Sequence, residues 1–258
     1  MKIGIISDIH EDIIRLEQSL RMLWSLKVDE VVCLGDIVGY SVPFYGYLKT
    51  RDSNRCIKLI RESCCEVVIG NHDLFAIKKI PSYASGFDYQ NWYDLDFETR
   101  KQRGVEKIFL YEDHELPALL NDESLEYLHS LPETIIKQTS DFNILLSHYA
   151  FPDITGSCRF EVDTCEDIHM HLDYMCKHNC TLGLSGNDHI PGFKAFTYNT
   201  RTQAPFRAEK LSRTPTWVTG PTVSKGTMPN GVMIFDTADF TIHAIPLGSD
   251  LHTLPSSI

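Results

Sequence analysis

Five short apolar segments of this chain each end in a cluster of Asp, His, Asn and Gly residues, and this repeated ending constrains the fold most. The segments span residues 2–7, 30–34, 66–69, 142–147 and 181–185, and their apolar, β-branched composition predicts strands. Helical stripes follow the first two, so strand and helix alternate and a largely parallel sheet is expected. Ligands of α/β sheets lie outside the carboxyl ends of the strands. The sequence therefore predicts that five loops bring their side chains to one crevice.

The strand-end clusters carry side chains that ligate metal ions. In chain order they are Asp8-Ile9-His10, Gly35-Asp36, Gly70-Asn71-His72-Asp73, Ser147-His148 and Gly186-Asn187-Asp188-His189. A carboxylate beside an imidazole suits a borderline divalent ion such as Mn²⁺, Fe²⁺ or Zn²⁺. Asp8 and His10 are two residues apart, so in an extended segment they point to the same side. A helix cap is the alternative for Asp8 alone, because a helical pattern follows it.

The region between residues 74 and 141 interrupts the strand rhythm. We expect a helical and aromatic insertion there, at about 75–140, within a single domain of residues 1–258. Its aromatic stretch at 83–97 either packs the insertion onto the core, which is favoured, or stacks a planar group of a substrate. A helix is predicted over 122–131. The tail at 217–223, 231–236 and 240–246 predicts three consecutive antiparallel strands.

Two helix starts are predicted from residues that cap helices. Ser53 precedes an apolar stripe and is expected to cap the helix that carries it. Thr164 and Asp167 resemble a capping box that opens a helix with Ile168 and Leu172 on its buried side.

The charge balance argues against a nucleic-acid partner. The chain has 24 Lys and Arg against 35 Asp and Glu, a net charge of −11, and its densest basic stretch covers only residues 100–103. Binding nucleic acid needs clustered cations that release counterions. No apolar run is long enough to cross a bilayer and no signal peptide is evident, so we expect a cytoplasmic protein with no membrane partner and eight reduced cysteines.

A second set of metal-binding residue types lies near residue 175. It comprises His169, His171, Cys176, His178 and Cys180. Zinc needs four converging ligands, and no Cys-x-x-Cys pair elsewhere completes such a set. Ordinary helix residues are therefore favoured over a structural zinc site. Arg159 is either a phosphate contact or an ordinary surface residue.

The ordered clusters resemble the calcineurin-like metallophosphoesterase superfamily, whose motifs run Asp-x-His, Gly-Asp, Gly-Asn-His-Asp/Glu, a strand-end His and Gly-His-x-His. The stretches at 5–10, 33–40 and 68–73 look most like its YfcE-like prokaryotic branch. The similarity covers residues 1–73 and 142–247. It implies an α/β (α+β) metallophosphoesterase fold, a two-sheet β-sandwich flanked by helices in αββα order.

The resemblance also implies a centre of two divalent ions, Mn²⁺ foremost, with Fe, Zn, Ni or Mg as alternatives. The implied ligands are Asp8, His10 and His189 for the first ion, Asn71 and His148 for the second, and Asp36 as the bridge between them. Such ions lower the pKa of a bound water and neutralise phosphoryl charge, so a metal-bound hydroxide would attack the phosphoester. His72 would be the general acid that protonates the leaving oxygen. The implied substrate is a small phosphorylated compound or nucleotide, either a phosphomonoester or a phosphodiester.

The chain departs from the family pattern in its last motif. Asn187 stands where the family has the first His of Gly-His-x-His, a ligand of the second metal. An amide oxygen ligates a borderline ion less well than an imidazole does, although it suits Mn²⁺ or Mg²⁺. The second site is then weaker, selective for a harder metal, or filled only with substrate. Asp188 could compensate, but alternation along an extended segment would point it away.

Two function classes are compatible with these residues. A phosphoester hydrolase is favoured, because Asp36 and His72 are both present. The alternative is a binding or scaffold protein that keeps the fold without turnover, as the retromer subunit with this fold does, and only Asn187 points that way. Metal content separates the two, since an active enzyme should load two ions. A DNA nuclease of the same fold is disfavoured by the acidic charge, while substrate, native metal and oligomeric state are not fixed by the sequence.

Overall fold

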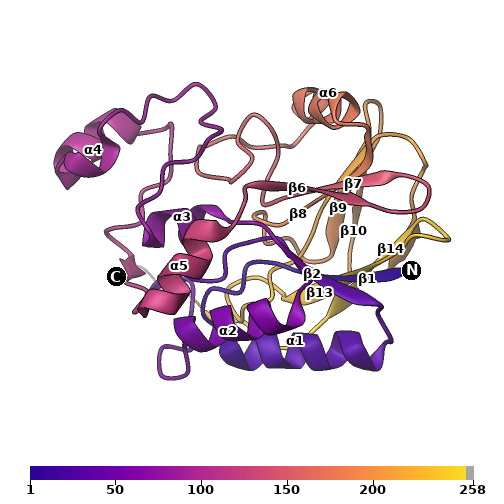
Figure 1. The fold of residues 1–258 in the computed structure, drawn as a ribbon, viewed down its shortest axis with the longest axis horizontal. Helices are drawn as coiled ribbons and strands as arrows, with labels where there is room; N and C mark the ends of the chain where they lie inside the picture. The colour runs from indigo at the N-terminus through magenta and orange to yellow at the C-terminus, as the bar shows by residue number, and fades with distance from the viewer. Residues whose placement is uncertain (254–258) are drawn as a thin grey trace.

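The computed structural model describes residues 1–253 and contains two six-stranded sheets packed face to face (Figure 1). The first sheet has the order β11 (Ala208–Lys210), β14 (Thr241–Pro246), β13 (Gly231–Asp236), β1 (Lys2–Ile6), β2 (Glu30–Cys33) and β4 (Glu66–Val67). The second has the order β10 (Arg201–Ala204), β9 (Phe193–Phe196), β12 (Thr216–Thr219), β8 (Cys180–Ser185), β7 (Asn143–Ser147) and β6 (Thr134–Gln138). A small third sheet pairs β3 (Tyr40–Ser41) with β5 (Glu115–Leu116).

Alternation along the strands decides which side chains fill the space between the two large sheets. In β1, Ile3 and Ile5 join a buried cluster that also contains Leu146 and Leu184 of the second sheet, whereas Ile6 faces the helices. Burying a side chain of this size contributes about 1.5–3 kcal/mol. This apolar layer holds the sheets against each other and therefore fixes the loops at their ends.

Helices cover the outer faces of the sandwich. The first sheet is covered by α1 (Ile13–Ser25), α2 (Ser53–Ser63) and α5 (Asp122–Ser130), and the second by α6 (His169–Lys177) (Figure 1). In α1, Leu16, Leu20 and Leu23 are buried at helical spacing, which gives the helix one apolar face. The predicted αββα sandwich is thus confirmed. Within residues 1–253, no helix is both long enough and apolar enough to cross a membrane.

The tail differs from the prediction of three consecutive antiparallel strands. Only β13 and β14 form a hairpin, in the first sheet. β12 lies in the second sheet, parallel to β8 and antiparallel to β9. All four residues of β12 are buried, as in a strand covered on both faces, and residues 220–230 then cross to the other sheet. Strand composition reports this burial, but it does not report which sheet the strand joins.

The inserted region follows α3 (Asn71–Ala76) and contains η1 (Trp92–Asp94), α4 (Phe97–Gly104) and β5. Tyr89 and Trp92 pack against Ile108 and Cys158, so the aromatic stretch forms a small core of its own, separate from the main core onto which the packing interpretation placed it. The prediction that strands are absent up to residue 141 is wrong, because β6 pairs with β7 in antiparallel register. As a partly exposed edge strand, β6 lacks a strong apolar pattern.

The helix starts also differ in detail from the prediction. Asp52, not Ser53, caps α2, and its carboxylate accepts the N–H of Arg55 at 3.0 Å. The N–H of Thr164 does donate to the carboxylate of Asp167 at 2.8 Å, but these residues form a turn, and α6 begins later.

Candidate metal centre

The loops that follow β1, β2, β4, β7 and β8 meet at one edge of the sandwich. They bring together all seven residues predicted for the site, namely Asp8, His10, Asp36, Asn71, His72, His148 and His189. Six of these form three overlapping groups in which the potential ligand atoms lie within 4.8 Å of one another. The groups are Asp8–His10–His189, His10–Asp36–His72 and Asp8–Asp36–His148.

Backbone strain marks the loops that carry these side chains. Asp8, His10, Asp36, Asn187 and His189 have φ between 47° and 65°. This left-handed region costs a residue other than glycine about 1–3 kcal/mol, and such strain concentrates at functional sites. The reason given above for the convergence of Asp8 and His10, an extended segment, is therefore wrong. The two side chains converge because the loop turns tightly.

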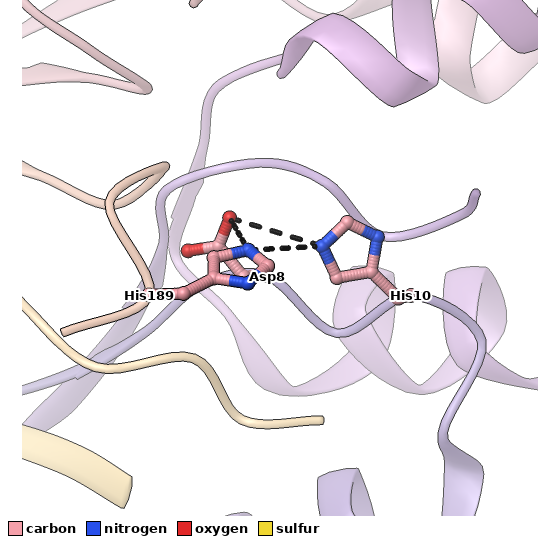
Figure 2. A group of neighbouring side chains, drawn as sticks. All are labelled: Asp8, His10 and His189. Atoms are coloured by element: carbon pink, nitrogen blue, oxygen red, sulfur yellow. Dashed lines mark hydrogen bonds and ion pairs between the residues drawn. The ribbon is translucent and has the colours of Figure 1, made fainter. Parts of the chain in front are cut away.

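Asp8, His10 and His189 form the first ligand group, in which the side chains point toward one another (Figure 2). The Nε2 atom of His189 lies 3.1 Å from Asp8 Oδ1 and 3.2 Å from His10 Nε2. His10 Nδ1 lies 2.9 Å from the Gly39 carbonyl and donates its proton there, so Nε2 presents a lone pair to the group. Burial lowers the pKa of His10 to about 3, which keeps the imidazole neutral. Imidazoles that ligate metals are neutral and held in this way.

Asp36 lies between the two halves of the cluster. Its Oδ2 atom is 3.2 Å from His148 Nε2 and 3.9 Å from the Nε2 atoms of His10 and His72. Burial alone would raise the pKa of Asp36, but the imidazoles of His148 and His72 outweigh this effect and hold the pKa below its ordinary value. A buried carboxylate that stays ionised and faces both halves of the cluster is able to bind a cation.

The second ligand group combines His148 and Asn71 with Asp36. His148 Nδ1 lies 2.6 Å from the Leu34 carbonyl, so this imidazole also directs Nε2 at the group. Asn71 is the first residue of α3, and its side-chain amide forms a hydrogen bond of 2.6 Å with the Tyr111 hydroxyl. Burial opposes protonation of His148, but the Asp36 carboxylate raises its pKa to about 10. A divalent ion bound here would displace that proton.

His72 offers its two ring nitrogens to different partners. Nδ1 lies 2.5 Å from the Glu115 carboxylate of β5, while Nε2 faces Asp36 at 3.9 Å. Burial opposes protonation, but the charges of Glu115 and Asp36 raise the pKa of His72 to about 9. The ring is therefore protonated at neutral pH and can act as a proton donor. Glu115 was not foreseen, because it lies in a two-residue strand inside the insertion, where no motif marks it.

Asp73 and Gly39 shape the loop around His72. The Asp73 carboxylate accepts the N–H groups of Ile37 and Val38 at 2.9 and 3.0 Å, which ties the loop after β2 to the start of α3. Gly39 has a φ of +97°, and a Cβ there would lie 2.6 Å from the Cβ of His72. Glycine is thus required at this close approach.

Asn187 and Asp188 have different surroundings. The Asn187 N–H donates to Asp8 Oδ2 at 3.1 Å, and its Oδ1 faces the backbone of Gly156, where a Cβ would lie 2.2 Å from that oxygen. Asp188 lies 3.7 Å from the Lys194 ammonium and belongs to none of the three ligand groups. Asp188 points away from the centre as predicted. The predicted reason was again an extended segment, whereas Asn187 has a φ of 65°.

A cavity of about 480 Å³ opens onto the cluster. His72, Asn187 and His189 contribute to its polar side. Its apolar wall is formed by Phe44, Tyr45, Phe109, Tyr111 and Met228. Among the residues that the structure describes, no lysine or arginine lines this cavity.

The remaining candidate residues lie outside the centre. His171 lies on the buried face of α6 and accepts the Phe151 N–H at 2.8 Å. No ligand group found within residues 1–253 includes His171 or the nearby His169, Cys176, His178 and Cys180. His169, His171 and Cys176 belong to α6, whereas Cys180 begins β8. The eight cysteines are free thiols. Arg159 lies over the Phe109 ring at 5.4 Å and does not line the cavity, as an ordinary surface residue would.

A family model described as calcineurin-like phosphoesterase matches residues 1–191. The chain belongs to this family. A curated relative, an uncharacterized protein of Methanocaldococcus jannaschii, is 29% identical over 183 residues, which are 67% of this chain and 63% of the relative. The chain thus spans slightly less than two thirds of that relative.

Two solved structures share the fold of this calcineurin-like phosphoesterase. A metallophosphoesterase from Sphaerobacter thermophilus is 20% identical, with a TM-score of 0.66 over 97% of this chain and 89% of its own. A hypothetical protein from Pyrococcus horikoshii is 13% identical, with a TM-score of 0.60 over 96% of this chain and 88% of its own. The stretch that matches the family model contains every residue of the Asp/His cluster.

Proposed function

We propose that this calcineurin-like phosphoesterase is an active hydrolase of small phosphomonoesters or phosphodiesters that uses two divalent ions, Mn²⁺ foremost. The observation that carries the proposal is the buried, ionised Asp36, which lies within 3.9 Å of ring nitrogens in both ligand groups. Buried charges are expected to be paired or to coordinate metals. The surrounding imidazoles and carboxylates fit borderline divalent ions.

The donor set divides into two sites that share one carboxylate. Asp8, His10 and His189 would hold the first ion, Asn71 and His148 the second, and Asp36 both. When bound, such ions lower the pKa of a water and neutralise phosphoryl charge. His72 keeps its second proton on Nε2, because Glu115 occupies Nδ1, and so can protonate the leaving oxygen. General acid catalysis of this kind contributes about 10²–10⁴-fold.

The cavity supports a substrate with one phosphoryl group and a planar apolar group. Phe44 and Phe109 line it and are 43% and 40% exposed, and Arg159 covers one face of Phe109, so both rings still offer aromatic surface for stacking. Stacking of a base on an aromatic ring is worth about 1–3 kcal/mol. A polyphosphate would find no counter-charge in this wall, since no lysine or arginine of the described residues lines it. Aryl and nucleoside phosphoesters therefore fit best.

A substrate screen tests the proposal. Mn²⁺-loaded protein should hydrolyse p-nitrophenyl phosphate, bis(p-nitrophenyl) phosphate or a nucleotide, and His72→Ala should lower the rate by about 100-fold or more at unchanged metal content. Absence of hydrolysis for all three substrates would overturn the proposal. Full activity of His72→Ala would remove His72 from its role. The scaffold alternative is separated by metal content, because it requires no second bound ion.

A further inference from the structure

The second metal site of the proposed dinuclear centre lacks one ligand compared with the family pattern. Asp36, Asn71 and His148 remain, but Asn187 stands in place of an imidazole. The Oδ1 atom of Asn187 faces the Gly156 backbone. The question is which atom of this chain occupies the ligand position that Asn187 leaves open.

The amide of Asn71 identifies that atom. With Nδ2 turned toward the Tyr111 hydroxyl, Oδ1 at the other end of the amide lies 3.2 Å from Asp36 Oδ2, 3.0 Å from His148 Nε2 and 3.1 Å from the main-chain oxygen of Thr155. In this orientation Asn71 Oδ1 faces the Asp36 carboxylate and the Thr155 carbonyl, two acceptors that carry no hydrogen. A cation satisfies such a set, whereas without one the amide is better turned round, with its NH₂ on the three acceptors.

The spacing of these atoms fits a ligand shell. Ligands at right angles around an ion with bonds of about 2.1 Å are about 3.0 Å apart. The Thr155 carbonyl is buried, and within residues 1–253 it has no donor while Asn71 Oδ1 faces it. A buried carbonyl without a partner is unfavourable, so it too requires a cation or the turned amide.

The loop after β7 explains how this carbonyl reaches the site. The Asp153 carboxylate accepts the N–H groups of Ser157 and Cys158 at 3.0 and 2.8 Å, which folds the loop back on itself. Gly156 then has a φ of +72° and contacts Asn187 closely. The smaller amide at position 187 leaves room for the Thr155–Gly156 peptide to pack against it.

We propose that the main-chain carbonyl oxygen of Thr155 replaces the missing imidazole as a ligand of the second metal, a reading that rests on the proposed dinuclear centre. The second site then consists of three oxygens and one nitrogen, from Asp36, Asn71, Thr155 and His148. A site dominated by carboxylate and carbonyl oxygens favours Mn²⁺ or Mg²⁺ over softer ions. Asn187 is not a metal ligand in this arrangement.

A crystal structure of the full chain with Mn²⁺, located by anomalous scattering, tests the proposal directly. The expected result is a second Mn²⁺ at a bonding distance of about 2.0–2.6 Å from the Thr155 oxygen. A second Mn²⁺ bound instead by Asn187, or with Thr155 outside bonding distance, would overturn it. This readout does not depend on hydrolysis, so an inactive protein that binds two ions refutes the proposed function and leaves the ligand assignment standing.

Calorimetric titration of Mn²⁺ into metal-depleted protein provides a second readout. Asn187→Ala should keep the affinity for the second ion within about twofold, whereas a tenfold or larger loss would mark Asn187 as the ligand. Gly156→Val should weaken the second ion at least about tenfold, because a β-branched residue does not hold a φ of +72° and the Thr155 peptide must move. Unchanged binding of the first ion shows that the variant is folded. An unchanged second ion in Gly156→Val contradicts the proposal.

Discussion

Replacing Glu115 by Gln tests whether this carboxylate keeps His72 protonated. The Glu115 side chain is 2% exposed and lies 2.5 Å from His72 Nδ1, where it helps to raise the pKa of His72 to about 9. Glutamine keeps the size of the side chain but removes its charge. Burial lowers the pKa of His72, and without the Glu115 charge to offset this effect the pKa should fall toward 6.5 or below. A fall from 9 to 6.5 corresponds to about 3 kcal/mol.

The assay is the pH dependence of kcat/KM. Wild type and Glu115→Gln are compared at equal Mn²⁺ loading, so that bound cations act on His72 equally in both proteins. A general acid is active below its pKa, so the basic limb of the profile should move to lower pH in Glu115→Gln. Glu112→Gln is the matched control, because Glu112 lies in the same segment but pairs with Arg100. A basic limb that stays in place in Glu115→Gln would refute the role of this contact.

Three further predictions concern the metals, the loop at Gly39 and acid stability. Chelation by EDTA should abolish hydrolysis and lower Tm, and Mn²⁺ should restore both, since ions that bind only the folded chain stabilise it; activity that survives chelation contradicts this. Gly39→Ala should lower kcat at least about tenfold, because its Cβ would lie 2.6 Å from the His72 Cβ. Gly86→Ala is the control: Gly86 also has a positive φ, of +80°, but a Cβ there meets open space, so kcat should stay unchanged. Burial lowers the pKa of His171 to about 3, so between pH 6.5 and 3 this histidine is protonated in the unfolded chain but not in the folded one. The free energy of unfolding should therefore fall as the pH drops from 6.5 toward 3. Urea denaturation should show a smaller fall in His171→Gln, and equal falls would count against this cause.

The strand-end residues could be predicted because the topology of the sheets determines where their loops lie. β1, β2 and β4 are parallel, and so are β7 and β8, so the loops that follow them meet at one edge. The position of Asp36 or His148 then follows from where its strand ends. The left-handed backbone of Asp8 and His10 could not be read from the spacing of two, because extended and tightly turned loops bring such residues together equally well.

Other parts of the site could not be predicted, for reasons that differ. Glu115 lies far along the chain in a two-residue strand, too short for any periodicity to show. Tyr111 belongs to the insertion, where aromatic residues also build a separate core. The carbonyl of Thr155 has no side-chain signature at all. Sequence patterns thus report elements that are long and buried, while the residues that orient the site come from irregular loops.

The most direct test of the dinuclear account is to measure bound Mn²⁺ and phosphoester hydrolysis in the same samples of the wild-type protein and of Asp36→Asn. The wild type should bind two ions per chain and gain activity as the second one binds. Asp36→Asn should lose the second ion together with most of the activity, because it removes the shared carboxylate. Full hydrolysis with a single bound ion, or an Asp36→Asn variant as active as the wild type, would contradict the account.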